Sequence, residues 1–480
     1  MAALMLLMQG GAAAAPPSSI RFATYNVSLF RSTAGGLISE LASPAGTTAN
    51  HGNIRQVAGA LQRVRPDVLL LNEFDYDAAG EAMTLFHDNF LTIAQEASLS
   101  ALQYPYRYTA PSNTGVSSGF DLDNNGTAVI TPGTEAYGND CFGFGTFPGQ
   151  YGMVAYSKFP ITTAQIRTFQ LFKWKDMPGS QLLLNAGSPP LTTYYTPAER
   201  DVLRLSSKTH LDVPVDIGGG ILVHILASHP TPPTFDGAEN KNGKRNFDEI
   251  KLWADYIDPA RAGYLHDDAG GTGGLAAGAR FVIKGDQNAD PNDGDTLSGA
   301  ARQLTQHPLI NASFIPSSGA NGGGANFAGG AGQTGNKLHD TAAFSGGLRV
   351  DYVLPSKAGF TLRTGGVFWP GPSDPLRAVV SDTDPSDHHM VWMDLRPEIS
   401  LQEAVQQFKA TWSGDSITLT WTAAPGYSYS VQQSPSLSPD SWVDSGVTPV
   451  IEPGSLLATA KVPATAPGRT FYRLQVMFLP

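Results

Sequence analysis

The sequence contains one cysteine, Cys141, so no disulfide can form within the chain. Such a chain can enter an oxidising compartment, but it carries no disulfide framework that would indicate one. Basic residues are also scarce, since 31 Lys and Arg stand against 42 Asp and Glu and give a formal net charge of −11. This balance argues against tight, nonspecific binding to a long polyanion such as duplex DNA, which needs a basic surface.

Long apolar runs are absent as well, because no segment beyond the N-terminus approaches the roughly 18 residues of a membrane span. Residues 1–15, MAALMLLMQGGAAAA, join a short apolar run to small residues, as in the core and cleavage site of a secretory signal. The basic start of such a signal is missing. We therefore expect residues 1–19 to be a signal-like or disordered N-terminus of a protein that is secreted, periplasmic or held at the cell surface.

A chain of 480 residues is expected to form more than one domain, because single cores rarely exceed about 250–300 residues. Up to Pro397, apolar strand-like segments mix with helical ones, which predicts an α/β (α+β) domain over residues 20–397. Residues 398–480 instead contain short alternating runs rich in Ser, Thr, Trp and Tyr, which predict a small all-β sandwich. We interpret this second part as an accessory module that could attach the protein to a cell surface.

The segment FVIKGDQNADPNDGD, residues 281–295, places an apolar strand directly before acidic and amide side chains. Asp286 and Asn288 are two residues apart, so in an extended chain their side chains lie on the same side. A carboxylate can take a proton from water, and a carboxamide can donate hydrogen bonds to a phosphate oxygen. Asp, Asn and Gly are, however, more common in solvated turns.

Other apolar segments also end in polar residues. Two segments have helical spacing instead, residues 53–64 and 247–257. A single polar residue at a strand end is more often solvated than catalytic, so each one gains meaning only from the others. These residues are Asn26 in IRFATYNVSL (20–29), Glu73 in DVLLLNE (67–73), His229 after ILVHILAS (221–228), Asp351 in RVDYVL (349–354), and Asp387 with His388 before a predicted strand at 390–395.

The order of these residues resembles that of the endonuclease/exonuclease/phosphatase superfamily, the DNase I-like metal-dependent phosphoesterases. Each short motif is weak alone, but six motifs in order at strand ends are a strong signal. The resemblance implies a four-layer α/β sandwich, in which two mostly antiparallel sheets pack face to face with helices outside. The matching segments are TYN (24–26), NE (72–73), SH (228–229), GDQN (285–288), RVDYV (349–353) and SDHH (386–389).

By resemblance, Asn26, Glu73 and Asp387 lie around a divalent metal ion. Mg²⁺ or Mn²⁺ is expected, since these hard cations prefer carboxylate and amide oxygens.

The resemblance also implies the catalytic roles. Asp286 orients and deprotonates the attacking water, while Asn288 holds a phosphate oxygen. His388, oriented by Asp351, stabilises the charge that grows on the phosphorus. His229 does the same or protonates the leaving group. Donors arranged in advance around the transition state are what in-line attack on a phosphate ester requires.

Cationic residues lie between these motifs. Residues 202–215, VLRLSSKTHLDVPV, alternate like a strand and place Arg204 and Lys208 on one face, while NGKRN contributes Arg245. Such residues are more often surface charges than phosphate ligands. If they face the site, a terminal phosphate dianion becomes a more attractive substrate than a diester.

The segment DLDNNG copies the first half of a calcium-binding loop with Asp121, Asp123 and Asn125. The second half does not match, because Pro132 occupies the twelfth position, where such a loop carries Glu. A structural Ca²⁺ and a plain polar turn both remain open at this stage.

Together these features favour a secreted, metal-dependent phosphoric ester hydrolase in which an activated water attacks in line. A phosphomonoesterase or small-molecule phosphodiesterase leads. An extracellular endonuclease acting on nucleic acid comes second because the chain is acidic, and a lipid phosphodiesterase of the sphingomyelinase kind comes third. The alternative from another functional class is a non-catalytic binding or adhesion protein on the same scaffold. The predicted site is complete, which argues against this alternative.

Overall fold

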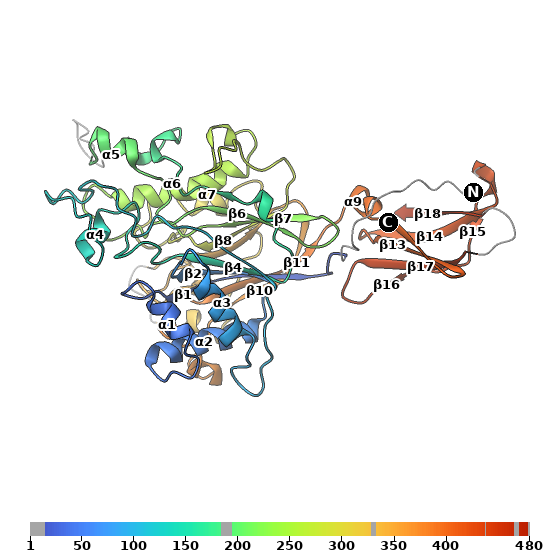
Figure 1. The fold of residues 1–480 in the computed structure, drawn as a ribbon, viewed down its shortest axis with the longest axis horizontal. Helices are drawn as coiled ribbons and strands as arrows, with labels where there is room; N and C mark the ends of the chain where they lie inside the picture. Colours follow the sequence, from blue (N-terminus) through green and yellow to red (C-terminus); the bar gives the residue numbers. More distant parts are fainter. Residues whose placement is uncertain (1–14, 184–193, 328–332, 437, 465–469, 479–480) are drawn as a thin grey trace.

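The computed structural model describes residues 15–183, 194–327, 333–436, 438–464 and 470–478. Most of the predicted signal-like segment, residues 1–14, therefore lies outside the described residues. An α/β body and a smaller all-β part follow one another along the longest axis (Figure 1). Within the described ranges, no helix combines the length and the apolar character needed to cross a membrane.

The first sheet of the body has six strands in the order β10-β11-β1-β2-β4-β3. Only β1 and β2 run parallel, and the other neighbours pair antiparallel. The strands are β1 (Ile20–Leu29), β2 (Val68–Phe74), β3 (Tyr106–Thr109), β4 (Met153–Ser157), β10 (Phe360–Phe368) and β11 (Met390–Pro397).

The second sheet has five strands in the order β5-β6-β7-β8-β9, and only β7 and β8 run parallel. Both sheets are thus mixed but mostly antiparallel, as expected. The strands are β5 (Arg167–Thr168), β6 (Leu211–Asp216), β7 (Leu222–Ala227), β8 (Phe281–Asp286) and β9 (Asp351–Pro355).

The two sheets pack face to face over a shared apolar core. Phe22 and Val68 of the first sheet meet Val213, Val223 and Val282 of the second in one buried cluster. A second cluster lies beneath α6 (Lys241–Tyr256) and a third beneath α2 (Ala49–Val64). Helices therefore cover the outer faces, and the predicted four-layer sandwich is confirmed.

Helix α2 begins and ends where its sequence provides caps. The Thr48 side chain accepts a hydrogen bond from the backbone N–H of His51, and Arg65 closes the helix in a left-handed conformation. Pro66 follows and cannot continue the helix. The shorter helices are α1 (Gly36–Leu41), α3 (Glu81–Phe86), α4 (Glu135–Asn139), α5 (Pro197–Val202), α7 (Arg302–Thr305), α8 (Gly323–Asn326) and α9 (Leu401–Gln406). Single turns of π- or 3₁₀-helix are η1 (His87–Leu91), η2 (Thr163–Gln165), η3 (Trp174–Asp176), η4 (Gln181–Leu183), η5 (Ala262–Tyr264), η6 (Lys337–His339), η7 (Pro375–Ala378) and η8 (Pro439–Ser441).

The C-terminal part consists of two wholly antiparallel sheets, with strand orders β12-β13-β17-β16 and β15-β14-β18. Trp421, Val431 and Val462 pack in one cluster between them. The all-β prediction for this part is confirmed, whereas the boundary at residue 397 stays a prediction. The strands are β12 (Lys409–Ser413), β13 (Ser416–Thr422), β14 (Tyr427–Ser434), β15 (Val443–Asp444), β16 (Val450–Ile451), β17 (Leu457–Pro463) and β18 (Phe471–Phe478).

One predicted strand is wrong over its first half. Residues 202–215 were expected to alternate throughout, but β6 begins only at Leu211. The preceding backbone bonds to separate partners instead of to one neighbouring strand: Leu205 N–H donates to the Phe172 carbonyl (2.9 Å). Ser207 N–H donates to Glu249 Oε1 (2.6 Å). Arg204 and Lys208 therefore do not share a strand face.

Candidate active site

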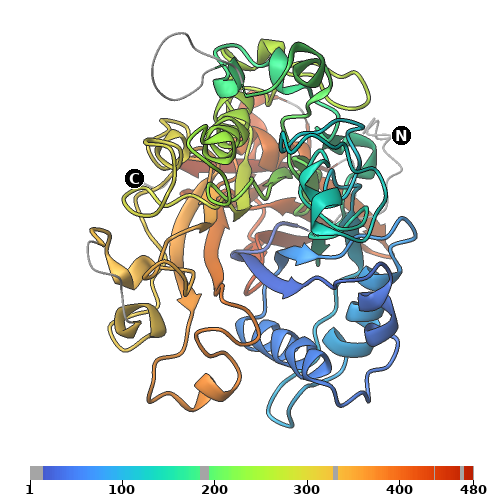
Figure 2. The same ribbon diagram turned by 90° about the vertical axis from the view of Figure 1, so that its left-hand side faces the viewer.

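Strand ends from both sheets meet at the end of the sandwich away from the C-terminal sheets, which faces the viewer in Figure 2. Asn26 Nδ2, near the end of β1, donates to Asp286 Oδ2 of β8 (3.1 Å). Asn72 Nδ2 of β2 donates to the backbone carbonyl of Ser228 after β7 (3.4 Å). The carboxyl ends of the parallel pair β1 and β2 in the first sheet thus lie next to those of the parallel pair β7 and β8 in the second.

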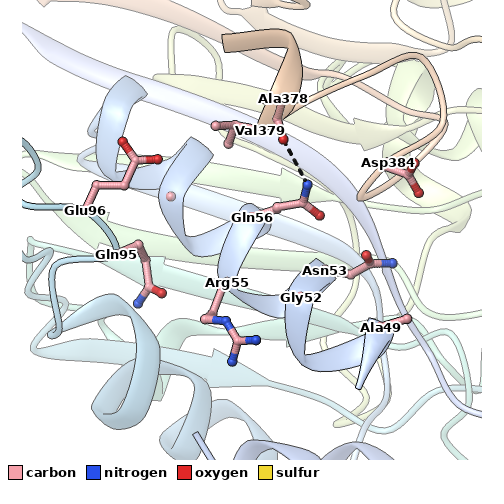
Figure 3. A pocket seen from close by; sticks show the side chains of 11 residues that line it. Ala49, Gly52, Asn53, Arg55, Gln56, Gln95, Glu96, Ala378, Val379 and Asp384 are labelled. Carbon is pink, nitrogen blue, oxygen red and sulfur yellow. Dashed lines mark hydrogen bonds between the residues drawn. The ribbon is translucent and has the colours of Figure 1, made fainter. Parts of the chain in front are cut away.

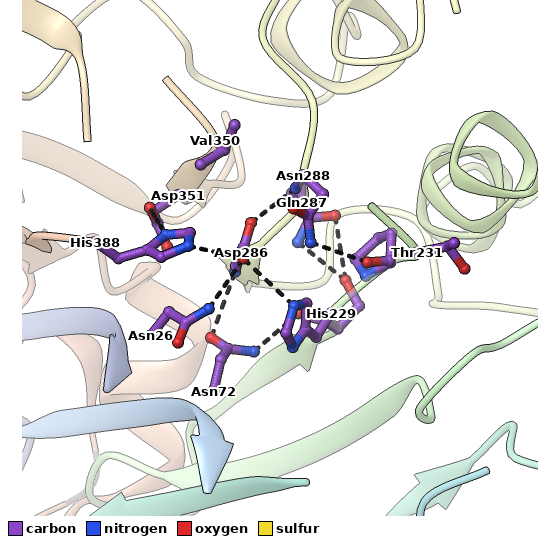
Figure 4. Close-up of polar contacts among 12 residues, drawn as sticks. Asn26, Asn72, His229, Thr231, Asp286, Gln287, Asn288, Val350, Asp351 and His388 are labelled. Atoms are coloured by element: carbon purple, nitrogen blue, oxygen red, sulfur yellow. Dashed lines mark hydrogen bonds and ion pairs between the residues drawn. The ribbon is translucent and has the colours of Figure 1, made fainter. Parts of the chain in front are cut away.

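Asp286 is the centre of this cluster (Figure 4). Its Oδ2 lies 3.3 Å from His229 Nε2 and 3.6 Å from His388 Nε2, and its Oδ1 accepts the Asn288 N–H (2.8 Å). Burial alone would raise the pKa of this carboxyl group, but the charge of His388 and the hydrogen bond from His229 outweigh burial and lower it. Asp286 is therefore ionised at neutral pH.

His388 is oriented by Asp351, as the resemblance implied. Nδ1 of His388 lies 2.9 Å from Asp351 Oδ2, which also accepts a hydrogen bond from Thr341 Oγ1 (2.8 Å). Burial alone would lower the pKa of His388, but the carboxylates of Asp351 and Asp286 raise it well above its usual value. The other ring nitrogen, Nε2, faces Asp286.

Asp286, Asp351 and His388 form a candidate metal site, since one ligand atom from each lies within 4.8 Å of the others. Asp351 Oδ1 is buried and has no hydrogen-bond partner among the described residues, so it keeps its lone pairs for a cation. Buried carboxylate oxygens in this number suit a hard divalent ion. The residues present therefore fit such an ion.

Glu73 and Asp387, two of the residues expected to surround the metal, are not among the three ligand groups that lie within 4.8 Å of one another. In the described part of the chain, neither carboxylate takes part in a hydrogen bond or an ion pair with another residue. Glu73 has a φ of 57°, a left-handed conformation that is uncommon outside glycine. Asp387 is half-buried, directly before His388.

Asn288 is also left-handed, with a φ of 50°. Its Nδ2 donates to the Pro230 carbonyl (3.1 Å), which ties this turn to the segment after His229. An amide nitrogen has two hydrogens, so one donor is left for a ligand.

Asn72 was quoted only as a neighbour of Glu73, yet it joins both sheets. Its Oδ1 accepts from the Asp286 N–H (3.4 Å) and from Thr24 Oγ1 (3.3 Å), in addition to the bond from its Nδ2 to Ser228. The NE motif at residues 72–73 was the feature of the sequence that could have identified Asn72 as part of the site.

Glu249 on α6 was missed altogether. It is fully buried and accepts the backbone N–H groups of Ser207 and Thr231, both at 2.6 Å, so it fixes the loops on either side of the site. A single Glu within a helix gives no sequence signal for such a role.

Two of the predicted cationic ligands are engaged elsewhere. Arg204 Nη1 donates to Asn113 Oδ1 (2.6 Å), and its guanidinium lies 4.3 Å from the centre of the Phe142 ring. Arg245 Nε donates to the Leu205 carbonyl (2.8 Å) and its Nη2 to the Arg204 carbonyl (2.9 Å). Both arginines thus shape the loop beside the site.

Lys208 differs from these arginines. It is 7% exposed, and its ammonium has no hydrogen bond or ion pair among the described residues. Burial lowers its pKa, against the opposing charges of Glu249, Glu73 and Asp286. Of the three predicted cations, Lys208 alone is left free to meet a ligand in this part of the molecule.

The calcium-loop residues lie in a separate, more exposed turn. Oxygens of Asp121, Asp123 and Asp140 lie within 4.8 Å of one another. Asn125 N–H donates to both Asp121 (3.1 Å) and Asp123 (3.2 Å), and the Asp140 oxygens accept backbone N–H groups as well. Calcium binding by this turn stays a prediction.

A cavity of about 580 Å³ opens between α2 and the segment around residues 378–384 (Figure 3). Gly52 and Gly59 leave room along the helix, and Gln56 Nε2 donates to the Ala378 carbonyl (3.2 Å). None of the strand-end residues lines this cavity. The candidate catalytic residues therefore lie in the cluster around Asp286 and not in this cavity.

The chain matches one protein-family model and is similar to several solved structures. A model of the Endonuclease/Exonuclease/phosphatase family matches residues 23–388, and no curated protein sequence matches the chain. A similar solved structure is that of an endonuclease/exonuclease/phosphatase from Beutenbergia cavernae DSM 12333, with 16% identity, coverage of 96% of this chain and 94% of that chain, and a TM-score of 0.44. TDP2 from C. elegans is 14% identical over 79% of this chain and 75% of its own, with a TM-score of 0.36. ANGEL2, a 2′,3′-cyclic phosphatase, is 11% identical over 81% of this chain and 99% of its own, with a TM-score of 0.37.

The family match spans well over half of the chain and contains every strand-end residue of the site, from Asn26 to His388. The site combines the ionised carboxylate of Asp286, the contact between Asp351 and His388, and a buried Asp/Asp/His cluster that could hold a metal ion. The chain is therefore a phosphoesterase that belongs to the endonuclease/exonuclease/phosphatase family.

Proposed function

We propose that the protein hydrolyses phosphomonoesters or small phosphodiesters with the help of a divalent metal ion. The observation that carries this proposal is the position of Asp286, an ionised and buried carboxylate held between the imidazoles of His229 and His388. A water bound beside this carboxylate would be oriented for in-line attack on the phosphorus.

The residues around Asp286 divide the remaining tasks. The imidazolium of His388, held by Asp351, stabilises the negative charge that grows on the phosphoryl oxygens. Asn288 offers its second amide hydrogen to one of these oxygens. Each such donor contributes roughly 10²- to 10³-fold to the rate.

Asp286 and Asp351 would hold the metal ion, with Asn26 bonded to Asp286 and Asp387 directly before His388. Glu73 remains a further expected ligand at the end of β2. Mg²⁺ or Mn²⁺ would neutralise phosphate oxygens and favour attack by water. The neighbouring imidazoles lower the pKa of Asp286, so this carboxylate is ready for a cation without a change of protonation, whereas burial raises the pKa of Asp351 to about 6.

The monoester preference is supported by Lys208, a buried side chain whose ammonium has no partner in the described structure and whose pKa is influenced by the charge of Asp286. An ammonium group attracts a terminal phosphate dianion more strongly than it attracts a diester, which carries less negative charge. The net charge of −11 makes a nuclease acting on long nucleic acid the second candidate. Export or attachment at the cell surface is part of this proposal, and the signal-like N-terminus and the appended β sheets support it.

The test is hydrolysis of p-nitrophenyl phosphate and bis-p-nitrophenyl phosphate with Mg²⁺, Mn²⁺, Ca²⁺ or EDTA, for wild type and Asp286→Ala. We expect metal-dependent turnover, faster on the monoester, that the variant loses. The matched control is Asp201→Ala, which removes a surface carboxylate that pairs only with Lys175 and should keep full activity. Absence of turnover on both esters, on DNA and on sphingomyelin in a folded, metal-loaded protein would overturn the proposal.

A further inference from the structure

Asp351 and His388 lie on different sheets, yet their side chains meet at 2.9 Å (Figure 4). Asp351 is the first residue of β9 in the second sheet, and His388 stands two residues before β11 in the first. Hydrogen bonding within a sheet therefore cannot set the distance between them. Another segment of the chain must hold the two residues together.

That segment is formed by residues 341–343, which follow the chain around His388. Ala342 and His388 form an antiparallel bridge. The Thr341 carbonyl accepts the His389 N–H (2.7 Å). The backbone of this short segment thus fixes the position of the histidine half of the pair.

The side chain of Thr341 binds the aspartate half. Its Oγ1 accepts the N–H groups of Val350 and Asp351, both at 3.0 Å. Because β9 is the edge strand of its sheet, N–H groups at its start need acceptors from outside the sheet. Thr341 is 1% exposed, so no solvent competes for these bonds.

The backbone bonds also direct the hydroxyl hydrogen of Thr341. A hydroxyl group has one hydrogen and two lone pairs, and the two N–H groups occupy both lone pairs. The hydrogen is left for Asp351 Oδ2, which lies 2.8 Å from Oγ1. Among the described residues, the other acceptor in reach is the Leu348 carbonyl, at 3.5 Å. The shorter contact is therefore the hydrogen bond that Thr341 donates.

This hydrogen bond gives the two oxygens of Asp351 different partners. Oδ2 accepts from Thr341 and from Nδ1 of His388, whereas Oδ1 has no partner in the described part of the chain. Without the Thr341 hydroxyl, the carboxylate is free to rotate away from Nδ1. The imidazole would then lose the acceptor that orients its ring.

We propose that Thr341 is a positioning residue for phosphoester hydrolysis. It holds Asp351 Oδ2 against Nδ1 of His388 and thereby keeps Nε2 of His388 directed at Asp286. This inference rests on the proposed function and extends it to a side chain that acts only through its neighbours.

Thr341→Val replaces the hydroxyl with a methyl group of similar size. We expect kcat on p-nitrophenyl phosphate to fall roughly 10- to 100-fold, with KM changed by less than about 2-fold, because the imidazole acts in the transition state. Thr341→Ser keeps the hydroxyl and should stay within about 3-fold of wild type. Added to Asp351→Asn, Thr341→Val should lower kcat by less than about 2-fold more, since it acts through Asp351.

The orientation of His388 can also be observed without turnover. An Nδ1 proton that is bonded to a carboxylate gives a proton NMR signal downfield of the amides, and its absence in His388→Gln assigns it. In the full chain without added metal, we expect this signal in wild type and in Thr341→Ser. In Thr341→Val it should shift or disappear.

The matched control is Thr422→Val, because Thr422 is also 1% exposed and donates a hydrogen bond, to Gln407 Oε1, far from the site. Both valine variants should lower the melting temperature, but only Thr341→Val should lower kcat. An unchanged kcat, a full further loss in the Asp351→Asn background or an unchanged His388 signal would overturn the proposal and leave Thr341 a purely structural residue.

Two further outcomes are separated by the design. If Thr341→Val does not fold, Thr341→Cys makes the same comparison, because a thiol is a weaker donor and acceptor than a hydroxyl. If wild type hydrolyses no ester, the proposed function fails, whereas the NMR signal of His388 still tests the hydrogen bond from Thr341.

Discussion

Two clusters of candidate metal ligands in this protein have similar distances between their ligand atoms but differ in the hydrogen bonds that their carboxylate oxygens accept. In each cluster, three candidate ligand atoms lie within 4.8 Å of one another. The first, Asp286 with Asp351 and His388, is buried between the ends of the two sheets. The second joins Asp121 and Asp123 of a half-exposed turn to the buried Asp140, which follows α4.

In the second cluster, the carboxylates already accept hydrogen bonds from backbone N–H groups. Asp121 Oδ2 accepts the Gly126 N–H (2.7 Å), and Asp140 accepts the N–H groups of Leu122 and Val129, both at 2.7 Å. Such bonds shape a loop by themselves. In the buried cluster, the carboxylates face imidazoles, and Asp351 Oδ1 has no partner among the described residues. Short distances between acids therefore do not define an ion site; the partners of each oxygen do.

The largest expected effect is that of Asp286→Asn. The amide keeps the shape of the side chain but removes the charge that orients water and attracts a cation. We expect kcat to fall by roughly 10³-fold or more while the melting temperature changes little, as measured by steady-state kinetics and calorimetry. A loss below about 10-fold would show that the buried cluster is not the catalytic centre.

Asp351→Asn and His388→Gln should each lower kcat by roughly 10²- to 10³-fold, because the first orients the second. Since the two residues act as a unit, the double variant should be little slower than either single variant. The measurement is a double-mutant cycle on kcat. Multiplicative losses would mean that the two residues act independently.

A buried acidic residue outside both clusters extends the comparison to stability. Asp340 is buried, accepts a hydrogen bond from Gln333 Nε2 (3.0 Å) and lies near Asp290 and Asp293. Burial raises its pKa from 3.8 to about 7. Between pH 3.8 and about pH 7, Asp340 keeps its proton in the folded state but has lost it in the unfolded state. The free energy of unfolding therefore falls as pH rises through this window.

Asp340→Asn removes this titration. We expect the variant to match wild type near pH 4 and to exceed its free energy of unfolding by roughly 1–2 kcal/mol at pH 8, a figure reduced for partial solvent screening. Urea unfolding at several pH values measures the difference. Parallel stability curves for the two proteins would contradict the expectation.

The smallest effect is expected at the surface turn. The double variant Asp121→Asn, Asp123→Asn should keep kcat within about 2-fold of wild type, since no catalytic residue contacts the turn. Ca²⁺ should shift the melting temperature of both proteins alike. A rise of several degrees in wild type alone would instead establish the calcium site predicted from the sequence and erase the contrast between the two clusters.

Much of the catalytic end could be predicted because local patterns determine it. The strand Ile20–Leu29 has the predicted bounds, since alternating or continuous apolar residues between turns leave little choice. The catalytic segments stand at strand ends, and their order along the chain was enough to indicate the family. The roles of the single residues stay predictions until the variants are measured.

The predicted strand over residues 202–215 failed because alternation alone does not supply a pairing partner. Residues 203–210 instead follow the contacts offered by α6 and by the loop around Asn113. Arg204 and Arg245 are bound to carbonyl and amide oxygens of that loop, which no spacing in the sequence reveals.

The sequence by itself determined the class of the fold, the positions of most core strands and the set of polar residues at their ends, because these depend on contacts within a few residues. Only the tertiary structure decided which of those residues meet, which cation stays unpaired and which carboxylates are ionised. Those properties depend on burial and on charges that lie far apart in the chain, as Asn26 and Asp286 do, and folding alone brings them within hydrogen-bond distance.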